Sequence, residues 1–340
     1  MKPFPGTILG LLAGTLLGHD GTLLTATATA ADAPAGSYHL LKEIAVGGEG
    51  NWDYLSVDPA GRRLYVSHGS KVVVIDVDQD TVVGEITDTP GVHGIAIAPE
   101  LGLAFTSNGR ENKASIVDLK TLQTKSKVAT GQNPDAILYE PGHQEVYTFN
   151  GRGNSATVFN AQTGEVVATI PLSGKPEFAA ADPAAGRVYC NIEDKNEILA
   201  LDTKTHTVVG HWPIAPGEEA SGLALDVAHH RIFIGCHNKL MPMIDSTNGK
   251  IVASVPIGGG VDANAFDPGT QLAFSSNGDE GTVTVAHEDS PEKLTVVQTL
   301  KTEKGARTMT LDTKTHKLYL ANRPRAGGAT AAFKVLVYGQ

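Results

Sequence analysis

Seven side chains recur at one fixed offset along this sequence, and six of the seven are ionisable. Each stands five residues before a turn-like marker, so a repeated fold would present all seven in the same way. Four carboxylates gathered in a concave site can bind a hard cation through oxygen ligands, and one with a raised pKa can serve as a base. The set comprises Asp53, His93, Asp135, Glu177, Ser221, Asp262 and Arg307.

The cationic and aromatic side chains near these carboxylates widen the range of possible chemistry. His93 can ligate a metal or act as an acid or base, and Arg307 can neutralise the carboxylates or hold an anionic ligand. Trp52 precedes Asp53, and His68 ends the next segment of the same repeat. The alternative is a hydrated polar surface with paired charges and no ligand. We predict a ligand site, without assigning a catalytic residue, formed by Asp53, His93, Asp135, Glu177, Asp262, Arg307, His68 and Trp52.

The turn markers that define this offset recur every 40 to 45 residues. Asp-Pro and similar pairs start turns, because proline presets φ and a carboxylate caps nearby amides. A regular period of this length is the mark of a repeat architecture. The markers are Asp58-Pro59, Ala98-Pro99, Glu140-Pro141, Asp182-Pro183, Asp226-Val227, Asp267-Pro268 and Asp312-Thr313.

Each repeat contains four short strand-like segments. In the second repeat they fall at residues 94–98, 103–106, 114–118 and 126–129, and no stretch shows sustained helical periodicity. Asn-Gly pairs such as Asn108-Gly109 predict hairpin turns, because both positions accept φ > 0. This pattern predicts an all-β, seven-bladed β-propeller with four-stranded blades. The first strand of each blade lines the central channel of a propeller, so the seven repeated side chains should meet at one channel mouth.

The two ends of the chain indicate how the ring closes. The last repeat has only three strand-like segments, the last of them at residues 333–338. A surplus strand, residues 39–46, precedes the first repeat and is similar to the fourth strands of other repeats. We therefore expect the N-terminal strand to complete the last blade and to cover an edge that would otherwise promote aggregation.

Short motifs within the repeats resemble the YVTN-repeat propellers, including the YncE-like bacterial periplasmic proteins. The resemblance covers about residues 38–340 and is specific for the fold. The resemblance carries little information about activity. The family name suggests DNA binding, and seven-bladed lactonases resemble the same architecture, although a fold does not fix a function. The motifs are Tyr147-Thr148-Phe149-Asn150, Thr163-Gly164-Glu165-Val166-Val167, Tyr65-Val66-Ser67-His68, Phe105-Thr106-Ser107-Asn108, Phe274-Ser275-Ser276-Asn277 and Tyr319-Leu320-Ala321-Asn322.

Composition narrows the partners. The formal net charge is −10, so the overall field does not attract nucleic acid, and we expect none as a partner. The two cysteines, Cys190 and Cys236, form no CxxC pair, which excludes the common zinc and haem motifs. Their redox state is open, and buried free thiols are the simpler expectation.

The N-terminal segment is typical of an export signal. Lys2 supplies a positive start, residues 8–17 are apolar, and small residues follow around Ala30 and Ala31. We predict a signal peptide at 1–31, a linker at 32–37 and one propeller domain at 38–340. Such a chain would be periplasmic or secreted, without a transmembrane segment in its mature form.

Three functions are compatible with these features. We expect a binding module that holds a small molecule or a protein loop at the channel mouth and acts as a monomer. The alternative is a lactonase- or hydrolase-type enzyme that uses the carboxylates with a divalent cation. Nucleic-acid binding is a weaker third reading. The sequence does not identify the ligand or establish whether a metal is bound.

Overall fold

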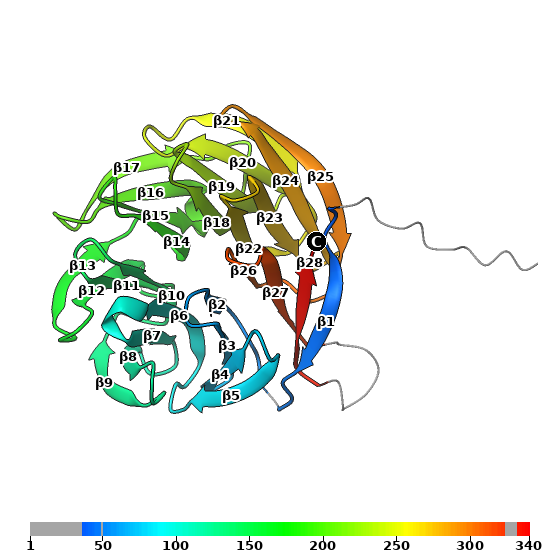
Figure 1. Ribbon diagram of the computed structural model, residues 1–340. Coiled ribbons are helices and arrows are strands. Elements are labelled where there is room, and N and C mark those ends of the chain that lie inside the picture. Colours follow the sequence, from blue (N-terminus) through cyan, green and yellow to red (C-terminus); the bar gives the residue numbers. More distant parts are fainter. Residues whose placement is uncertain (1–35, 49, 324–331) are drawn as a thin grey trace, which may run out of the picture. The chain divides into compact units, whose positions relative to one another are not determined.

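Seven four-stranded antiparallel sheets form the part of the chain that the computed structural model describes, residues 36–48, 50–323 and 332–340. The sheets are arranged as blades around a central axis (Figure 1). The all-β, seven-bladed propeller predicted from the repeat is therefore confirmed. The predicted signal peptide and residues 32–35 of the predicted linker lie outside the described residues.

Each of the first six blades contains four consecutive strands, ordered from the axis outward. Blade 1 contains β2 (Leu55–Asp58), β3 (Arg63–His68), β4 (Lys71–Asp76) and β5 (Thr81–Ile86). Blade 2 contains β6 (Val92–Ala98), β7 (Leu103–Asn108), β8 (Lys113–Asp118) and β9 (Thr124–Ala129), with the short 3-10 helix η1 (Pro99–Leu101). Blade 3 contains β10 (Pro134–Glu140), β11 (Glu145–Asn150), β12 (Ser155–Asn160) and β13 (Val166–Pro171).

The remaining blades follow the same plan. Blade 4 contains β14 (Pro176–Asp182), β15 (Arg187–Ile192), β16 (Glu197–Asp202) and β17 (Thr207–Pro213), with the 3-10 helix η2 (Glu193–Lys195). Blade 5 contains β18 (Ala220–Asp226), β19 (Arg231–Cys236), β20 (Leu240–Asp245) and β21 (Ile251–Pro256). Blade 6 contains β22 (Val261–Asp267), β23 (Leu272–Asn277), β24 (Thr282–Ser290) and β25 (Lys293–Lys301). Blade 7 contains β26 (Met309–Asp312), β27 (Lys317–Asn322), β28 (Lys334–Gly339) and β1 (His39–Ala45).

The first strand of the chain completes the last blade. β1 pairs antiparallel with β28, so blade 7 has the order β1-β28-β27-β26. In Figure 1 the blue first strand lies along the red last strand. The predicted closure is confirmed, with each predicted strand end shifted by one residue at most. The ring cannot open without breaking this strand pair, which also covers the outer edge of β28.

The burial of each strand follows from its place in the blade. Every residue of the second strand β7 is buried, because neighbouring blades cover both of its faces. The outer strand β5 buries only Ile86 and exposes Val82 and Val83. Apolar side chains of adjacent blades interdigitate between the sheets, so the core is a series of clusters between blades.

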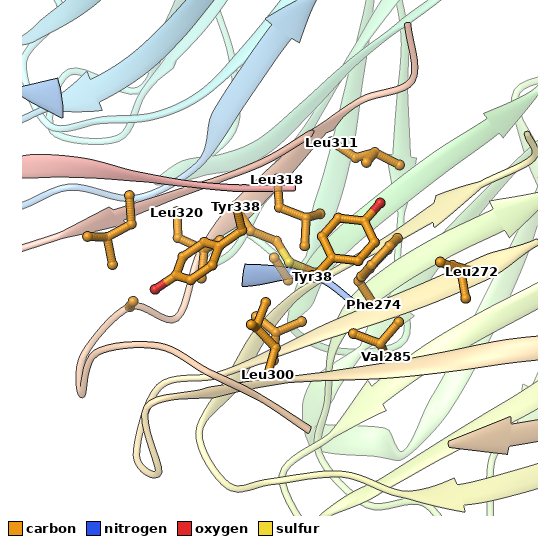
Figure 2. Packing of buried hydrophobic residues seen from close by; sticks show 14 residues of the cluster. Tyr38, Leu272, Phe274, Val285, Leu300, Leu311, Leu318, Leu320 and Tyr338 are labelled. Carbon is orange, nitrogen blue, oxygen red and sulfur yellow. The ribbon is translucent and has the colours of Figure 1, made fainter. Parts of the chain in front are cut away.

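Tyr38, the residue before β1, anchors the closing strand between blades 6 and 7 (Figure 2). Its ring packs edge-on against Phe274 at 5.1 Å, and its hydroxyl donates to the carbonyl of His316 at 2.8 Å. Its backbone exchanges two hydrogen bonds with the side chain of Gln298. The N-terminal segment is thus held by side-chain packing as well as by the ladder with β28.

The expectation for the Asn-Gly pairs is wrong in its physical reason. Asn108 is the last residue of β7, fully buried, and its side-chain amide donates to Ser115 across the hairpin. The positive φ in this loop falls at Asn112, not at Asn108 or Gly109. The asparagine therefore pairs the second and third strands, and the glycine has a different role, given below.

Cys190 and Cys236 are both buried free thiols, in blades 4 and 5. Across the described ranges, no helix has the length and apolar character needed to cross a bilayer.

We predict that Tyr38→Ala lowers the free energy of unfolding by about 3–5 kcal/mol, because it removes a large buried ring. Tyr38→Phe should cost only about 0.5–1.5 kcal/mol, the value of one hydrogen bond. Chemical denaturation of the full chain measures both. Leu40→Ala is the control, since this β1 side chain is exposed and should change stability by about 0.5 kcal/mol or less. Equal effects of Tyr38→Ala and Leu40→Ala would contradict the anchoring role.

Candidate functional site at the channel mouth

The seven repeated positions lie at the same end of the inner strands. Five of them are the second residues of β6, β10, β14, β18 and β22, while Asp53 and Arg307 lie two residues before β2 and β26. A cavity of about 2230 Å³ opens at this end, and its lining includes Asp53, His93, Glu177, Asp262 and Arg307. The common register of the inner strands thus brings these five side chains to one mouth.

His93 lies between two carboxylates from the blades on either side. Its Nδ1 is 2.6 Å from Oδ2 of Asp53 and 3.5 Å from Oδ1 of Asp135. The three potential ligand atoms lie within 4.8 Å of one another, close enough to hold a metal ion. Burial by itself would lower the pKa of His93, but the hydrogen bond to Asp53 and the charge of Asp135 outweigh it and raise that pKa.

The other two carboxylates each have a nearby cation. Nε of Arg307 lies 2.6 Å from Oδ2 of Asp262, and the Ser221 hydroxyl donates to Oδ1 of the same residue at 3.2 Å. Nζ of Lys175 lies 3.0 Å from Oε2 of Glu177 and also pairs with Glu193. Ser221 is the one non-ionisable residue among the seven repeated positions, and it takes part in the cluster as a hydrogen-bond donor to Asp262.

The positive charge is too small to keep every carboxyl ionised. Burial, with the repulsion of Asp135 second, raises the pKa of Glu177 to about 8 despite Lys175. Burial likewise raises the pKa of Asp135 to about 7 against the opposing charge of His93. Burial raises the pKa of Asp262 to about 6, and Arg307 limits that rise. The ligand-free cluster therefore retains protons near neutral pH.

Tyr54 crosses the ring beneath this cluster. Its hydroxyl donates to the carbonyl of Glu177 at 3.3 Å, and its ring packs edge-on against Phe178 at 5.3 Å. A side chain from blade 1 thus reaches blade 4 on the other side of the axis. Its burial removes water from below the carboxylates, which contributes to their desolvation, and its own pKa is raised by burial and by their charges.

Two glycines make room for the ring of side chains. A Cβ at Gly109 would lie 2.7 Å from Nε2 of His93, and a Cβ at Gly278 would lie 2.7 Å from Cβ of Arg307. Both contacts are shorter than real Cβ atoms tolerate. Gly109 therefore accommodates His93 of its own blade, and Gly278 accommodates Arg307 of the next blade, whereas a Cβ at Gly151 would make only ordinary contacts of 3.6 Å or more.

The rim of the cavity is more basic than its floor. Arg110, Arg152 and Lys304 are exposed lining residues, and none of their side chains makes an ion pair or hydrogen bond within the described ranges. Asp279 and Glu303 also line the rim. The floor therefore attracts positive charge, and the rim offers cationic groups that are not yet paired.

His68 and Trp52 line the cavity away from the carboxylate cluster. His68 is buried and stacks on Phe333 at 4.4 Å, while Trp52 packs on the same ring at 5.6 Å. Burial and then Lys71 lower the pKa of His68, although the carbonyls of Asn51 and Gly47 oppose the fall. The structure places both rings beside blade 7, so they form a side wall of the cavity.

Sequence reasoning missed Tyr54 and Lys175. Tyr54 stands one position after the repeated offset. At this position Phe178 is the one other aromatic residue, and most of the remaining repeats have a small residue, such as Gly94, Ala136, Gly222 and Ala263. Two large rings among small residues at one repeat position could have signalled a filled channel. Nothing in the sequence signals the pairing of Lys175 with Glu177, because no other repeat contributes a lysine there.

Comparison with known proteins supports the fold alone. No family model and no curated protein matches the chain. Among solved structures, the chain is similar to one described as Kuenenia stuttgartiensis hydrazine synthase, with a TM-score of 0.73 and 17% sequence identity. The match covers 82% of this chain and 94% of that one. At this identity the similarity establishes a shared β-propeller fold.

We predict that the pH dependence of stability changes when the mouth carboxyls are removed. A carboxyl whose folded pKa is raised stabilises the protonated native state, and that stability is lost as pH rises through the folded pKa. For Asp135 and Glu177, with pKa values of about 7 and about 8, the loss should run from about pH 4 to about pH 8. The ligand-free Asp135→Asn/Glu177→Gln variant should therefore gain Tm relative to wild type as pH rises, by roughly a few degrees.

Thermal unfolding at pH 5, 6, 7 and 8 measures this difference. Glu165→Gln provides the control, because this exposed carboxylate of blade 3 lies in the turn at the opposite end of the strands. Its Tm difference from wild type should stay constant. A difference for the double variant that is also constant over this range would refute the proton-retaining cluster.

Proposed function

We propose that the protein is a binding module whose channel mouth holds a small ligand with a positively charged group. The observation that carries this proposal is the charge balance of the floor. Four partly buried carboxylates share Lys175, Arg307 and His93, and three of them have raised pKa values. A bound cation would replace the retained protons and stabilise the charged carboxylates.

A divalent cation is the simplest ligand that fits the floor. Asp53, His93 and Asp135 offer two oxygens and one nitrogen within 4.8 Å of one another. Carboxylate oxygens suit Ca²⁺ and Mn²⁺, and an imidazole in the set favours Mn²⁺ over Ca²⁺. A small organic cation would pair with the same carboxylates, and it would not require the coordination geometry of a metal ion.

The basic rim bears on the rest of the ligand. Arg110 and Arg152 lie on adjacent blades at the entrance, with Lys304 on a third. A ligand with a cationic end on the floor and an anionic end at the rim would meet complementary charge at both levels. A loop of a partner protein that carries a cationic and an anionic side chain would meet the same two charged levels. The protein would then bind another protein through the same channel mouth.

We predict that Mn²⁺ binds ligand-free wild-type protein and that Asp135→Asn/Glu177→Gln weakens this binding by about tenfold or more, because it removes one candidate ligand and a second charge. Isothermal titration calorimetry measures the affinity, with Ca²⁺ as the comparison ion. Glu165→Gln should bind Mn²⁺ as wild type does. Equal affinity in wild type and the double variant would leave a hydrated polar mouth as the better description.

One observation favours a hydrolase as the second candidate. His93 is hydrogen-bonded to Asp53, and Asp135 beside it has a pKa of about 7, which is suitable for a general acid or base. An enzyme of this kind would hydrolyse a simple lactone such as γ-butyrolactone, and Asp53→Asn would abolish the hydrolysis. Absence of turnover in the presence of Mn²⁺ or Ca²⁺ would leave binding as the function.

We also propose that the chain is a divergent YVTN-repeat protein that is exported to the periplasm or secreted, and that it acts there as a monomer. The support comes from the motifs on the second strands and from the N-terminal apolar segment. N-terminal sequencing of protein recovered from an exporting bacterial host should find a start near Ala31 or Asp32. Protein that keeps Met1 and stays inside the cell would contradict export.

A further inference from the structure

A second cluster of metal-ligating side chains lies between blades 5 and 6, at the end of the inner strands opposite the mouth. Asp226 ends β18, His229 lies in the following turn, and Glu288 is in β24. Nδ1 of His229 is 2.6 Å from Oδ2 of Asp226 and 3.7 Å from Oε1 of Glu288. All three ligand atoms lie within 4.8 Å of one another.

The repeat shows that Glu288 is an exception. Its backbone N–H donates to the carbonyl of Gln271 in the preceding hairpin, and five other blades make the equivalent bond from the residue that directly follows their third strand. The residues at this position in those blades are small, apolar or neutral. They are Val77, Leu119, Ala161, Thr203 and Ser246. A carboxylate here is not needed to build the blade.

The neighbouring inner strands indicate what is missing beside Asp226. The acids that end β22 and β26 are each paired with a basic side chain of the next blade, Asp267 with His316 at 2.6 Å and Asp312 with Arg62 at 2.7 Å. The residue at the same offset in blade 6 is the uncharged Gln271. Blade 6 therefore presents to Asp226 a second acid instead of a base.

In the part of the chain that the structure describes, the carboxylate of Glu288 makes no well-formed hydrogen bond, and its polar neighbours are Asp226 and, at 3.7 Å, Nδ1 of His229. Only 3% of the residue is exposed, and both carboxylate oxygens are buried without a well-formed hydrogen bond within the described ranges. Burial and then the charge of Asp226 raise the pKa of Glu288 to about 7. A buried carboxylate without a partner is costly unless a proton or a cation balances it.

One fixed positive charge lies nearby and is already engaged. The guanidinium of Arg231 approaches Asp245 at 3.6 Å and Glu292 at 3.7 Å, and its Nε donates to the carbonyl of Pro291. Counting Asp226 and Glu288, four acids surround this one arginine. The region therefore retains an excess of negative charge that His229 alone does not remove.

We propose that Asp226, His229 and Glu288 bind a divalent transition-metal ion that joins blades 5 and 6. One imidazole nitrogen with two carboxylate oxygens is a donor set suited to Zn²⁺, with bonds of about 2.0–2.2 Å. Binding displaces the proton between His229 and Asp226, and small side-chain movements close the set around the ion. His229 is 39% exposed, which gives the ion access and leaves room for water as a further ligand.

This site is independent of the ligand proposed for the channel mouth. Its members lie on the other side of the ring layer, and two adjacent blades contribute them. An ion held here would stabilise the native ring, because it binds the folded protein and not the unfolded chain. The expected readout is therefore a Zn²⁺-dependent rise in Tm as well as a bound ion.

The test uses full-length, chelator-treated protein that carries Asp135→Asn, so that the mouth cluster has lost one potential ligand. Native mass spectrometry and competition with a Zn²⁺ indicator should find one tightly bound Zn²⁺ per chain. Adding Glu288→Ser, which installs the residue that blade 5 has at the equivalent position, should weaken Zn²⁺ binding by about tenfold or more. His229→Gln should have the same effect on Zn²⁺ binding.

The pair Glu140 and His143 supplies the matched control. It has the same spacing in blade 3, with Nδ1 of His143 at 2.9 Å from Glu140, but the equivalent residue of the next blade is Thr203. His143→Gln should leave the Zn²⁺ affinity unchanged. The Glu288→Ser protein should be at least as stable as its parent without metal, which separates lost binding from lost folding. Zn²⁺ affinity that stays within twofold after Glu288→Ser, or the absence of Zn²⁺ binding in the Asp135→Asn parent, would overturn the proposal.

Discussion

The pairing of β1 with β28 is the contact on which the rest of this structure depends. It joins the two ends of the described chain and holds seven sheets in a closed ring, with Tyr38 as the side-chain anchor. Closure leaves little freedom in the orientation of the blades. All seven inner strands run in the same direction along the axis, because each one follows the outer strand of the preceding blade. Residues at one repeat position must therefore meet at one end of the channel, even when their charges repel.

The channel mouth is the electrostatic consequence of that geometry. Acids that would be well hydrated on separate surface strands form a partly buried cluster here, with Tyr54 and Phe178 excluding water from below. Three local cations offset part of the charge, and protons retained near neutral pH offset more. At the opposite end of the ring, Asp267 and Asp312 each pair with a basic side chain of the next blade. Asp226 instead faces a second acid, Glu288, from the next blade. This pair of acids is the basis of the metal site that we propose there.

The sequence predicted the features that the repeat determines and missed those that depend on single side chains. The turn markers gave the number of blades, the unmatched end strands gave the closure, and the common offset placed Asp53, His93 and Arg307 at one mouth. Periodicity could not show that Tyr54 spans the ring, because its length matters and its repeat position is otherwise occupied mainly by small residues. The Asn-Gly pairs were located correctly but explained wrongly, since Gly109 accommodates His93 and does not supply a positive φ. His68 matched the register of a site residue, yet it stacks on Phe333, the residue before the last strand, and this contact could not be inferred from its own repeat.

If the mouth carboxyls hold protons that a cationic ligand displaces, binding of a cation must release protons. Calorimetric titration of the protein with Mn²⁺ at pH 6.5, in buffers of different ionisation enthalpy, gives the number of protons released for each ion bound. The raised pKa values of Asp135 and Glu177 predict release on the order of one proton per ion, and less after Asp135→Asn/Glu177→Gln. Binding of Mn²⁺ to the wild-type protein without proton release would show that the carboxyls are already ionised, and would contradict the account.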